Sequence, residues 1–534
     1  MKGLFNKNGI WTNGFWSKSF RKYSLWACVG LLLMGCVRAK NPMAVPEVPA
    51  LFPDYVGVTI PATIAPMNFA LADSAFTAVD VLLEGPEGTV LRVTARGREV
   101  QWPMRAWKAM LRKVRQRDAR RASDGQTSPA RDTNSQTVPA RSTNSQTVPV
   151  RASDSLMVTV RARGVDGTWR SFKPFPLYVN DAPIDYSLVY RLIAPGYEIY
   201  SRMGIYQREL STFKQTPVYE NTLIPQTCVN CHAFNQGNPD DFNLHIRGKQ
   251  GGTLLRQDGR MDYFNSKTDS TISFFAYPYW HPSGKYIAYS VNKTHQSFHE
   301  WAQARIEVFD KASDVLVYDT EHKKILYGPL LKTSDFETFP TFSPDGRTLY
   351  FCLAAHQDLP KAFADVRYNI CSLSFDPDKG TFGTHIDTVV NAVALGMSAS
   401  LPSPSYDGRF LMFTLADYGT FPNNHTESQL ALLDLQTHRW RYMDGLNSPF
   451  PESHHRWSTN SRWVVFSSRR QDGLFVYPYL AYIDENGQTG KPFLLPQKTP
   501  LAFYDQPVFS FNIPEFATKP IDLDYKALER AARN

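Results

Sequence analysis

Two cysteines and a histidine stand together near the middle of the chain, in the run Cys228-Val229-Asn230-Cys231-His232. This C-x-x-C-H spacing is the attachment signature of c-type haem, because two thiols bond the vinyl groups of the porphyrin and the histidine ligates the iron. We therefore predict one covalently bound haem c. Cys228 and Cys231 are its expected attachment residues, and His232 is its expected axial iron ligand.

A haem iron that only transfers electrons needs a second axial ligand. His245 follows His232 by 13 residues, in a segment expected to fold back over the porphyrin, and it is the predicted distal ligand. Met203 and Met261 are its rivals. If no side chain reaches the iron, the open position binds a small ligand or peroxide. The predicted function is therefore electron transfer or redox sensing of a small ligand, together with an unknown redox or envelope protein partner.

The same residues support two other kinds of site. In one, Cys228 and Cys231 form a zinc knuckle with His232 and His245, although zinc needs four ligands and the chain has no second knuckle. In the other, the cysteines form a disulfide or a redox dithiol. A catalytic dithiol precedes a helix, and the Asn-, Gly- and Pro-rich stretch 235–239 disfavours one. The alternative function is a non-enzymatic binding module in the cell envelope whose two cysteines are structural.

The first 35 residues have the composition of a targeting segment. Their apolar run, 23–34, is too short for a spanning helix, and the stretch before it is basic without an acidic residue. The run ends in Leu33-Met34-Gly35-Cys36, which resembles a bacterial lipobox. The resemblance implies that Cys36 is diacylated and anchors the chain in the envelope. No aspartate follows Cys36, which favours the outer membrane, facing the periplasm. An ordinary cleaved signal or an uncleaved anchor is the alternative.

The formal charge of +8 does not describe the body of the protein. The targeting segment contains five Lys and Arg and no acidic residue, and the stretch 105–152 contains eleven Lys and Arg against three Asp. These two stretches together exceed the net charge, so the rest of the chain is net acidic. This distribution argues against a nucleic-acid partner.

The N-terminal half is predicted to form a tether at 36–53, rich in Pro and Ala, and then a β-sandwich at 54–182. Alternating apolar runs separated by Gly and Pro turns indicate the strands of the sandwich. Apolar residues at spacings of three and four predict a short basic helix at 104–114. An insert at 116–154 contains ten-residue polar repeats such as SQTVPARSTN (135–144). The insert buries too little apolar surface to offset its ordering entropy, so we predict disorder there.

Four segments in the C-terminal half repeat one design, in which an apolar entry and a tight turn precede an aromatic-rich strand. They are YWHPSGKYIAYS (279–290), TFSPDGRTLYFC (341–352), SPSYDGRFLMFT (403–414) and RWSTNSRWVVFS (456–467). Further strand-like runs follow each copy, and a hairpin followed by two more strands in a period of about 50 to 60 residues is typical of a propeller blade. The runs 187–209 and 501–513 are expected to supply another one or two blades and to close the ring without an exposed edge.

These repeats resemble the blades of periplasmic TolB-like propellers, most closely in Phe342-Ser343-Pro344-Asp345-Gly346-Arg347. The resemblance covers about 270–500 and implies a fold rather than a chemistry. The whole chain also resembles exported Bacteroidetes-type proteins described loosely as TolB-like or cytochrome c biosynthesis-like, a group with no settled activity. The segments that carry this second resemblance are LFPDYVGVTIPATIAPMNF (51–69), TLIPQTCVNCHAF (222–234), HIRGKQGGTL (245–254) and PYLAYIDENGQTGKPFLLPQ (478–497).

The predicted fold is mostly β, with an N-terminal β-sandwich, a loop-rich haem-type segment and a C-terminal TolB-like β-propeller. The haem-type segment spans 183–268 and also offers possible first propeller strands, the propeller spans 269–515, and a tail follows at 516–534. Cys352 and Cys371 belong to neighbouring expected strands, where burial of both thiols and a disulfide are the two possibilities. No G-x-S-x-G elbow or Ser-His-Asp set is present, and an enzyme is not favoured.

Overall fold

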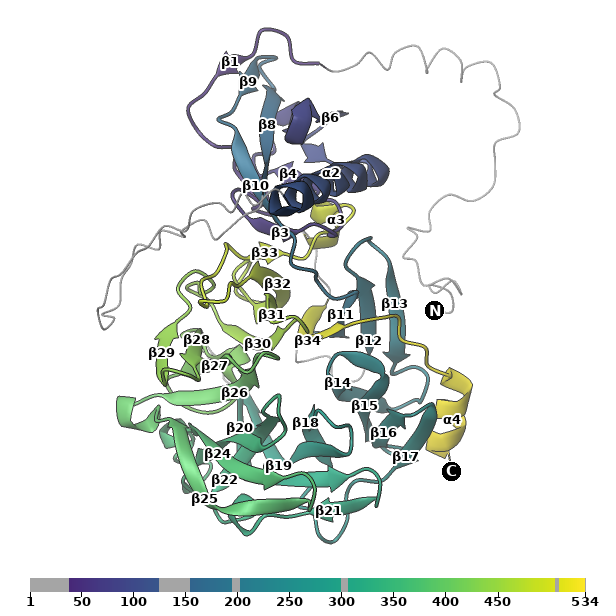
Figure 1. The fold of residues 1–534 in the computed structure, drawn as a ribbon, viewed down its shortest axis with the longest axis vertical. Helices are drawn as coiled ribbons and strands as arrows, with labels where there is room; N and C mark the ends of the chain where they lie inside the picture. The colour runs from purple at the N-terminus through teal and green to yellow at the C-terminus, as the bar shows by residue number, and fades with distance from the viewer. Residues whose placement is uncertain (1–37, 124–153, 195–201, 299–305, 505–508, 534) are drawn as a thin grey trace.

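A computed structural model describes residues 38–123, 154–194, 202–298, 306–504 and 509–533 (Figure 1). Strands dominate these residues, and they form a smaller N-terminal domain, at the top of Figure 1, and a ring of β-sheets. The prediction of a mostly-β chain with a propeller is confirmed. Cys36 and the polar repeats at 124–153 lie outside the described residues, and so do the predictions made for them.

The ring is a propeller of six blades, each with four strands. Blade 1 contains β11 (Ser187–Ile193), β12 (Met203–Glu209), β13 (Gln215–Glu220) and β34 (Ser510–Ala517). Blade 2 contains β14 (Thr227–Asn235), β15 (Asn238–Gly248), β16 (Gly252–Gln257) and β17 (Arg260–Phe264). Blade 3 contains β18 (Phe275–Trp280), β19 (Tyr286–Phe298), β20 (Ile306–Asp319) and β21 (Lys324–Leu326). Neighbouring strands within each blade are antiparallel.

The remaining three blades repeat this meander. Blade 4 contains β22 (Phe336–Phe342), β23 (Thr348–Ala354), β24 (Asn369–Asp376) and β25 (Thr381–Val390). Blade 5 contains β26 (Ser398–Pro404), β27 (Phe410–Ala416), β28 (Gln429–Asp434) and β29 (Arg439–Tyr442). Blade 6 contains β30 (Glu452–Trp457), β31 (Trp463–Ser468), β32 (Tyr477–Tyr482) and β33 (Phe493–Leu494). The tight turns recognised in the sequence join the first and second strands of blades 3 to 6. The turn at Gly346 has a φ of +73°, which a residue without a Cβ adopts at no steric cost.

The last strand of the chain closes the ring. β34 pairs antiparallel with β11, from Ser187 opposite Ala517 to Ile193 opposite Ser510, and so becomes the innermost strand of blade 1. A strand from the end of the chain therefore completes a blade begun more than 300 residues earlier. This arrangement leaves the ring without an open inner edge.

Every innermost strand carries a β-bulge at the same place. In each case the first bulged residue has a positive φ, between 42° and 54°, and the pairing register shifts there. The six residues are Cys231, Tyr277, Phe339, Leu401, His454 and Ile513. The residue after the bulge is proline in four blades and histidine in two, at His232 and His455. Cys231 and His232 thus occupy positions that recur in all six blades.

The N-terminal domain has two sheets and one long helix. The larger sheet contains β1 (Met43–Ala44), β3 (Thr59–Pro61), β5 (Phe76–Glu84), β6 (Val90–Arg96), β8 (Asp154–Gly164), β9 (Trp169–Ser171) and β10 (Phe175–Asn180), and the smaller one contains β2 (Leu51–Phe52), β4 (Phe69–Leu71) and β7 (Glu99–Val100). The helix α2 (Met104–Ser123) buries Trp107, Leu111 and Val114 in the core that both sheets share. Its apolar residues are the ones that the sequence pattern predicts.

One hydrophobic cluster joins this domain to blade 6, because it contains residues of both. The Tyr55 hydroxyl donates to the Leu494 carbonyl at 3.2 Å, and the Trp463 indole donates to the Ala182 carbonyl at 3.0 Å. The short helix α3 (Pro500–Tyr504) also packs there, in yellow beside β3 in Figure 1. The two parts of the protein therefore pack as one body.

The structure differs from the expected boundaries in three places. Within 183–268, where first propeller strands were also expected, the described residues form three strands of blade 1 and all of blade 2 rather than a loop-rich segment, because each apolar run there pairs with its neighbour. The stretch given to a tether contains β1 and β2, and the Ala39 amide already donates to Asp80 Oδ2 at 3.0 Å. The tail contains the end of β34 and the helix α4 (Tyr525–Arg533), whose Leu528 and Ala532 pack in the core of blades 1 and 2.

The remaining regular elements are short 3-10 turns: η2 (Pro86–Gly88), η3 (Pro329–Leu331), η4 (Phe363–Asp365), η5 (Val393–Leu395) and η6 (Pro422–Asn424). Within the part of the chain that the structure describes, no helix combines the length and the apolar character needed to cross a bilayer.

Candidate functional site

The six innermost strands surround two adjoining cavities on the propeller axis. The bulge chamber is lined by the six bulged residues and their neighbours: Cys231, His232, Tyr277, Pro278, Phe339, Pro340, Thr341, Leu401, Pro402, His454, Arg456 and Ile513. The tyrosine chamber is lined by Ala233, Phe234, Gln236, Pro278, Tyr279, Trp280, Ser403, Pro404, Tyr406, Arg456, Trp457 and Glu515. The enclosed space is about 40 Å³ in the bulge chamber and about 20 Å³ in the tyrosine chamber, which is room for only a few water molecules. Pro278 and Arg456 border both.

The C-x-x-C-H residues lie on β14 and point in different directions. Cys231 and His232 line the bulge chamber, whereas Cys228 packs beside the apolar cluster between blades 1 and 2. The His232 ring packs edge-on against Phe234 at 5.9 Å between centroids. Burial, together with the nearby Arg191 and Arg456, lowers the pKa of His232 to about 3, so its imidazole is neutral.

His245 lies on the strand beside the motif but faces the other side of the sheet. On β15, His245 is next to Leu244, and Leu244 is the residue opposite His232. Because adjacent residues of a strand point to opposite faces, the two imidazoles diverge. The His245 Nδ1 lies 3.3 Å from Thr253 Oγ1, and its ring packs against Phe274 toward blade 3.

The other predicted ligands are also apart from the chambers. Met203 and Met261 pack in the cluster between blades 1 and 2. All four cysteines of the described residues are free thiols. Among those residues, no group of three or more His, Cys, Asp or Glu side chains is arranged to hold a metal ion.

Cys352 and Cys371 lie on adjacent strands of blade 4 without pairing. Cys371 is opposite Phe351, so Cys352 points to the other face of the sheet. The two side chains belong to different apolar clusters. Burial raises the pKa of both thiols, Cys371 to about 11, so both are neutral core residues at ordinary pH.

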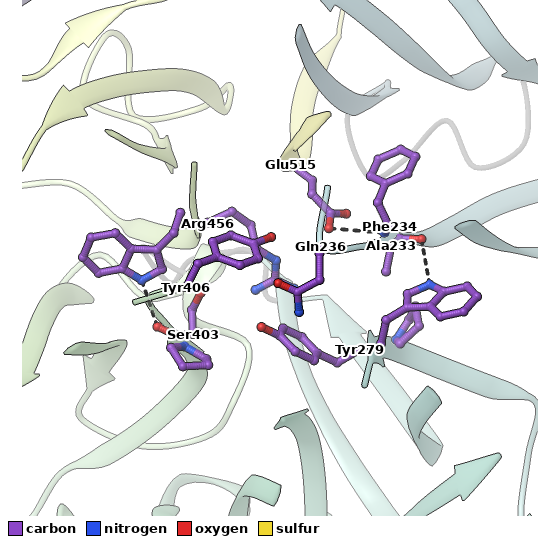
Figure 2. A pocket seen from close by; sticks show the side chains of 12 residues that line it. Ala233, Phe234, Gln236, Tyr279, Ser403, Tyr406, Arg456 and Glu515 are labelled. Atoms are coloured by element: carbon purple, nitrogen blue, oxygen red, sulfur yellow. Dashed lines mark hydrogen bonds between the residues drawn. The ribbon is translucent and has the colours of Figure 1, made fainter. Parts of the chain in front are cut away.

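The tyrosine chamber gathers polar side chains from several blades. Arg456 enters from β30 and Glu515 from β34, while Tyr279, Tyr406 and Gln236 converge on the same space (Figure 2). Glu515 is 8% exposed, and its Oε1 accepts a hydrogen bond from the Phe234 amide at 3.3 Å. Among the described residues, no carboxylate oxygen lies within 4.0 Å of the Arg456 guanidinium. The one hydrogen bond that this side chain makes with them is long, from Nη1 to the His455 carbonyl at 3.4 Å.

Two tryptophans line the chamber with their indole nitrogens already bonded. Trp280 Nε1 donates to the Ala233 carbonyl at 3.2 Å and to Asn243 Oδ1 at 3.1 Å, and Trp457 Nε1 donates to the Ser403 carbonyl at 3.0 Å. Figure 2 draws the bonds to the labelled residues Ala233 and Ser403 as dashed lines. Both tryptophans are only 2% exposed, so they belong to the packed wall of the chamber and present no free hydrogen-bond donor.

Burial changes the acid–base properties of the tyrosine chamber. It raises the pKa of Glu515 to about 7, against the lowering effect of Arg456. It also raises the pKa of Tyr279 to about 12, where Glu515 adds to the rise and Arg456 opposes it. Burial raises the pKa of Tyr406 as well, so both phenols are neutral donors at neutral pH, whereas Glu515 is divided between its two protonation states.

A loop of blade 5, residues 417–428, packs against residues of the bulge chamber. The Phe421 ring lies 6.3 Å from Tyr277 and 6.0 Å from Phe339, and Asn423 Nδ2 lies 2.9 Å from His454 Nε2. We call this segment the blade-5 loop. Its position is set by contacts with three other blades.

A buried histidine holds the blade-5 loop to blade 3. His425 Nδ1 lies 3.1 Å from Glu427 Oε1, and its Nε2 lies 3.6 Å from Glu307 Oε1, a charge contact longer than a hydrogen bond. Glu307 Oε2 accepts a hydrogen bond from the Tyr418 hydroxyl at 2.8 Å. The two carboxylates outweigh desolvation and raise the pKa of His425 to about 9. His425 is therefore protonated at neutral pH.

The chamber residues escaped the sequence analysis, although a signal for them exists. Arg456 and Glu515 both stand two residues after the bulge, at the position held by Ala233, Tyr279, Thr341 and Ser403 in the other blades. Alignment of the six inner strands on their bulges shows that two of the six carry opposite charges there. That alignment requires the bulges, which are visible only in the strand pairing.

Comparison with known proteins identifies no family for this chain and finds only distant similarity to solved structures. No protein-family profile matches the sequence, and no curated protein matches it. Among solved structures, TolB from Acinetobacter baumannii aligns with 68% of this chain and 79% of its own, at 11% identity and a TM-score of 0.38. An oligogalacturonate lyase in complex with manganese aligns with 57% of this chain and 78% of its own, at 14% identity and a TM-score of 0.35. A DUF4784 family protein from Bacteroides caccae aligns with 75% and 97%, at 8% identity and a TM-score of 0.30.

Proposed function

We propose that this protein is a non-enzymatic binding module whose tyrosine chamber holds a small polar solute. The observation that carries the proposal is the presence of Arg456 and Glu515 in one aromatic-lined cavity without an ion pair between them. Burying charged groups costs several kcal/mol unless partners compensate. Glu515 is buried and Arg456 is half-buried, and a bound solute would give each of them a further partner.

Intrinsic fluorescence and calorimetry test this proposal directly, because Trp280 and Trp457 border the chamber. We expect small polar solutes from envelope extracts to change tryptophan emission and to give a saturable binding isotherm. Arg456→Met keeps the length of the side chain and removes its charge, and we expect it to abolish binding. Arg439→Met is the matched control, because Arg439 is exposed on the outer strand β29. Equal binding by both variants would refute the chamber as the site.

We also propose that the chain is exported and held at the envelope through a lipid on Cys36. What supports this is the lipobox-like run and the position of Ala39, whose amide is bonded to Asp80. Two residues separate Cys36 from Ala39, so a lipid on Cys36 would place the N-terminal domain within about 10 Å of the membrane surface. Metabolic labelling with a fatty acid tests the site, and persistence of the label in Cys36→Ser would contradict it.

Covalent haem is the third proposal, supported by the C-x-x-C-H spacing and by the neutral, buried imidazole of His232. The described residues do not fit a porphyrin as they stand, because Cys228 lies outside the bulge chamber and His245 faces away from His232. A pyridine haemochrome spectrum of protein made in a host with haem-attachment machinery decides the question, and the absence of the band would end this proposal.

A further inference from the structure

The larger sheet of the N-terminal domain has a face that points away from the domain core. Val79, Val81 and Leu83 of β5 pack in the core. Because successive side chains of a strand alternate, Asp80 and its partners in the pairing point to the opposite side. We call that side the outer face. It consists of the even-numbered positions of 78–84 on β5 and of 90–96 on β6, and of the odd-numbered positions of 157–163 on β8.

The outer face is basic. It carries four arginines against two carboxylates: Arg92, Arg96, Arg161, Arg163, Asp80 and Glu84. Asp80 is buried under two of the arginines, since Arg92 Nε donates to its Oδ1 at 2.7 Å and Arg161 Nη1 lies 3.8 Å from its Oδ2. Arg96 and Arg163 are exposed, and no carboxylate oxygen of the described residues lies within 4.0 Å of either guanidinium. The face therefore presents an excess of positive charge to its surroundings.

The chain that leads from Cys36 into the fold crosses the outer face. β1 pairs with β9 at the edge of the sheet, whereas Ala39, four residues before β1, reaches Asp80 on β5, beyond β8. Burial raises the pKa of Asp80, but its bonds to the Arg92 side chain and the Ala39 amide outweigh burial and lower it, so this contact is made to a charged carboxylate. Residues 38 and 40, an arginine and a lysine, are exposed beside it.

Apolar side chains are exposed among these charges. Val90 and Met157 lie opposite Glu84 on the two neighbouring strands and are 52% and 37% exposed. Val165, in the turn directly after β8, is 77% exposed. Attachment to a membrane surface draws on both features, because buried apolar area and attraction between basic residues and anionic lipids add together. A soluble polyanion would use the charges alone.

We propose that the outer face lies against a membrane and that its arginines bind the anionic headgroups of phospholipids. This inference rests on the proposed lipid at Cys36, which would hold the face at the bilayer. The helix α2 is the other basic surface of the domain, and its Arg112 and Arg115 are exposed. Its apolar side packs in the core on the inner side of the sheet, so those arginines point away from the outer face.

Sedimentation with vesicles tests the inference on the chain from Val37 onward, which lacks the targeting segment and the lipid site and keeps every residue of the described fold. We expect it to bind vesicles of phosphatidylglycerol and phosphatidylcholine in equal parts, but not phosphatidylcholine alone. Arg96→Gln combined with Arg163→Gln should weaken binding roughly 25-fold, because each basic residue near an anionic surface contributes about fivefold. Arg260→Gln combined with Arg439→Gln is the matched control and should bind like the wild type, since both arginines are exposed on outer strands of the propeller.

Several results would overturn the inference. Binding to neither kind of vesicle, or to both equally, would show that anionic headgroups are not recognised, and binding to heparin without binding to vesicles would indicate a polyanion site instead. If Arg112→Gln combined with Arg115→Gln abolishes binding and the outer-face variant retains it, the helix rather than the sheet faces the membrane. Equal losses in the outer-face variant and the propeller control would mean that only net charge matters.

The lipid anchor and the outer face can fail separately. If Cys36 takes up no fatty acid while the outer-face variant alone loses vesicle binding, the proposed anchor is wrong and the headgroup site stands. If Cys36 is labelled and the outer-face variant binds anionic vesicles as tightly as the wild type, the anchor stands and the inference is wrong.

Discussion

Replacing His425 with asparagine removes a charge that ties the blade-5 loop to blade 3. The His425 side chain is 2% exposed, and Glu307 and Glu427 lie 3.6 Å and 3.1 Å from its two ring nitrogens. These contacts raise the pKa of His425 from 6.5 to about 9. At about 1.4 kcal/mol per pH unit, the shift corresponds to roughly 3 kcal/mol of folding free energy.

The sign of the pH dependence follows from the direction of the shift. A histidine with a raised pKa contributes its full stabilisation below its unfolded value of 6.5, and the contribution is lost as the pH rises through 9. Wild-type protein should therefore lose about 3 kcal/mol of unfolding free energy between pH 6 and pH 10 that His425→Asn does not lose. Burial would raise the pKa of Glu427, but its hydrogen bond to His425 outweighs burial and lowers that pKa. Protonation of Glu427 at low pH would add a second pH dependence, so the measurements should stay above pH 5.

Urea denaturation at several pH values, followed by tryptophan fluorescence and circular dichroism, measures this difference. His438→Asn is the matched control, because His438 is exposed and its φ of +54° is one that asparagine tolerates. The control should keep the pH dependence of the wild type. If His425→Asn and the wild type lose stability in parallel between pH 6 and pH 10, the buried charge contact does not hold the loop.

Three further outcomes are expected. Burial raises the pKa of Glu515 to about 7, so its contribution to the free energy of unfolding is complete below pH 4.5 and is lost as the pH rises through 7. In urea denaturation, Glu515→Gln should therefore reduce the loss of unfolding free energy over this pH range. An unchanged loss would contradict the burial of the carboxyl. Trp463→Ala should cost about 3–5 kcal/mol in the same assay, because it empties the core between blade 6 and the N-terminal domain; a loss below about 1 kcal/mol would contradict that packing. Deleting 509–534 should abolish the cooperative unfolding transition, since β34 closes the ring; a retained native transition would show that closure is dispensable.

The propeller was predictable from the sequence because its signals are local. The turn in Phe342-Ser343-Pro344-Asp345-Gly346 depends on residues within a few positions of one another, and the apolar alternation after it identifies a strand. The helix at the start of the basic insert was predictable for the same reason, from the spacing of Trp107, Leu111 and Val114. Blade 2 was harder to recognise, since its first turn, Gln236-Gly237, lacks the Ser-Pro-Asp-Gly pattern of the others.

The residues of C-x-x-C-H were identifiable from the sequence, but their directions were not. The same five-residue motif is compatible with a loop around a porphyrin and with a β-strand, so the sequence alone does not give the directions of its side chains. Only the pairing of β14 with β15, and the bulge at Cys231, send Cys231 toward the axis and turn His245 away from His232. Arg456 and Glu515 are 59 residues apart in sequence and meet only because the last strand returns to blade 1. The sequence by itself determined the strands and turns, which depend on neighbouring residues, whereas closure of the ring decided which side chains share the axis.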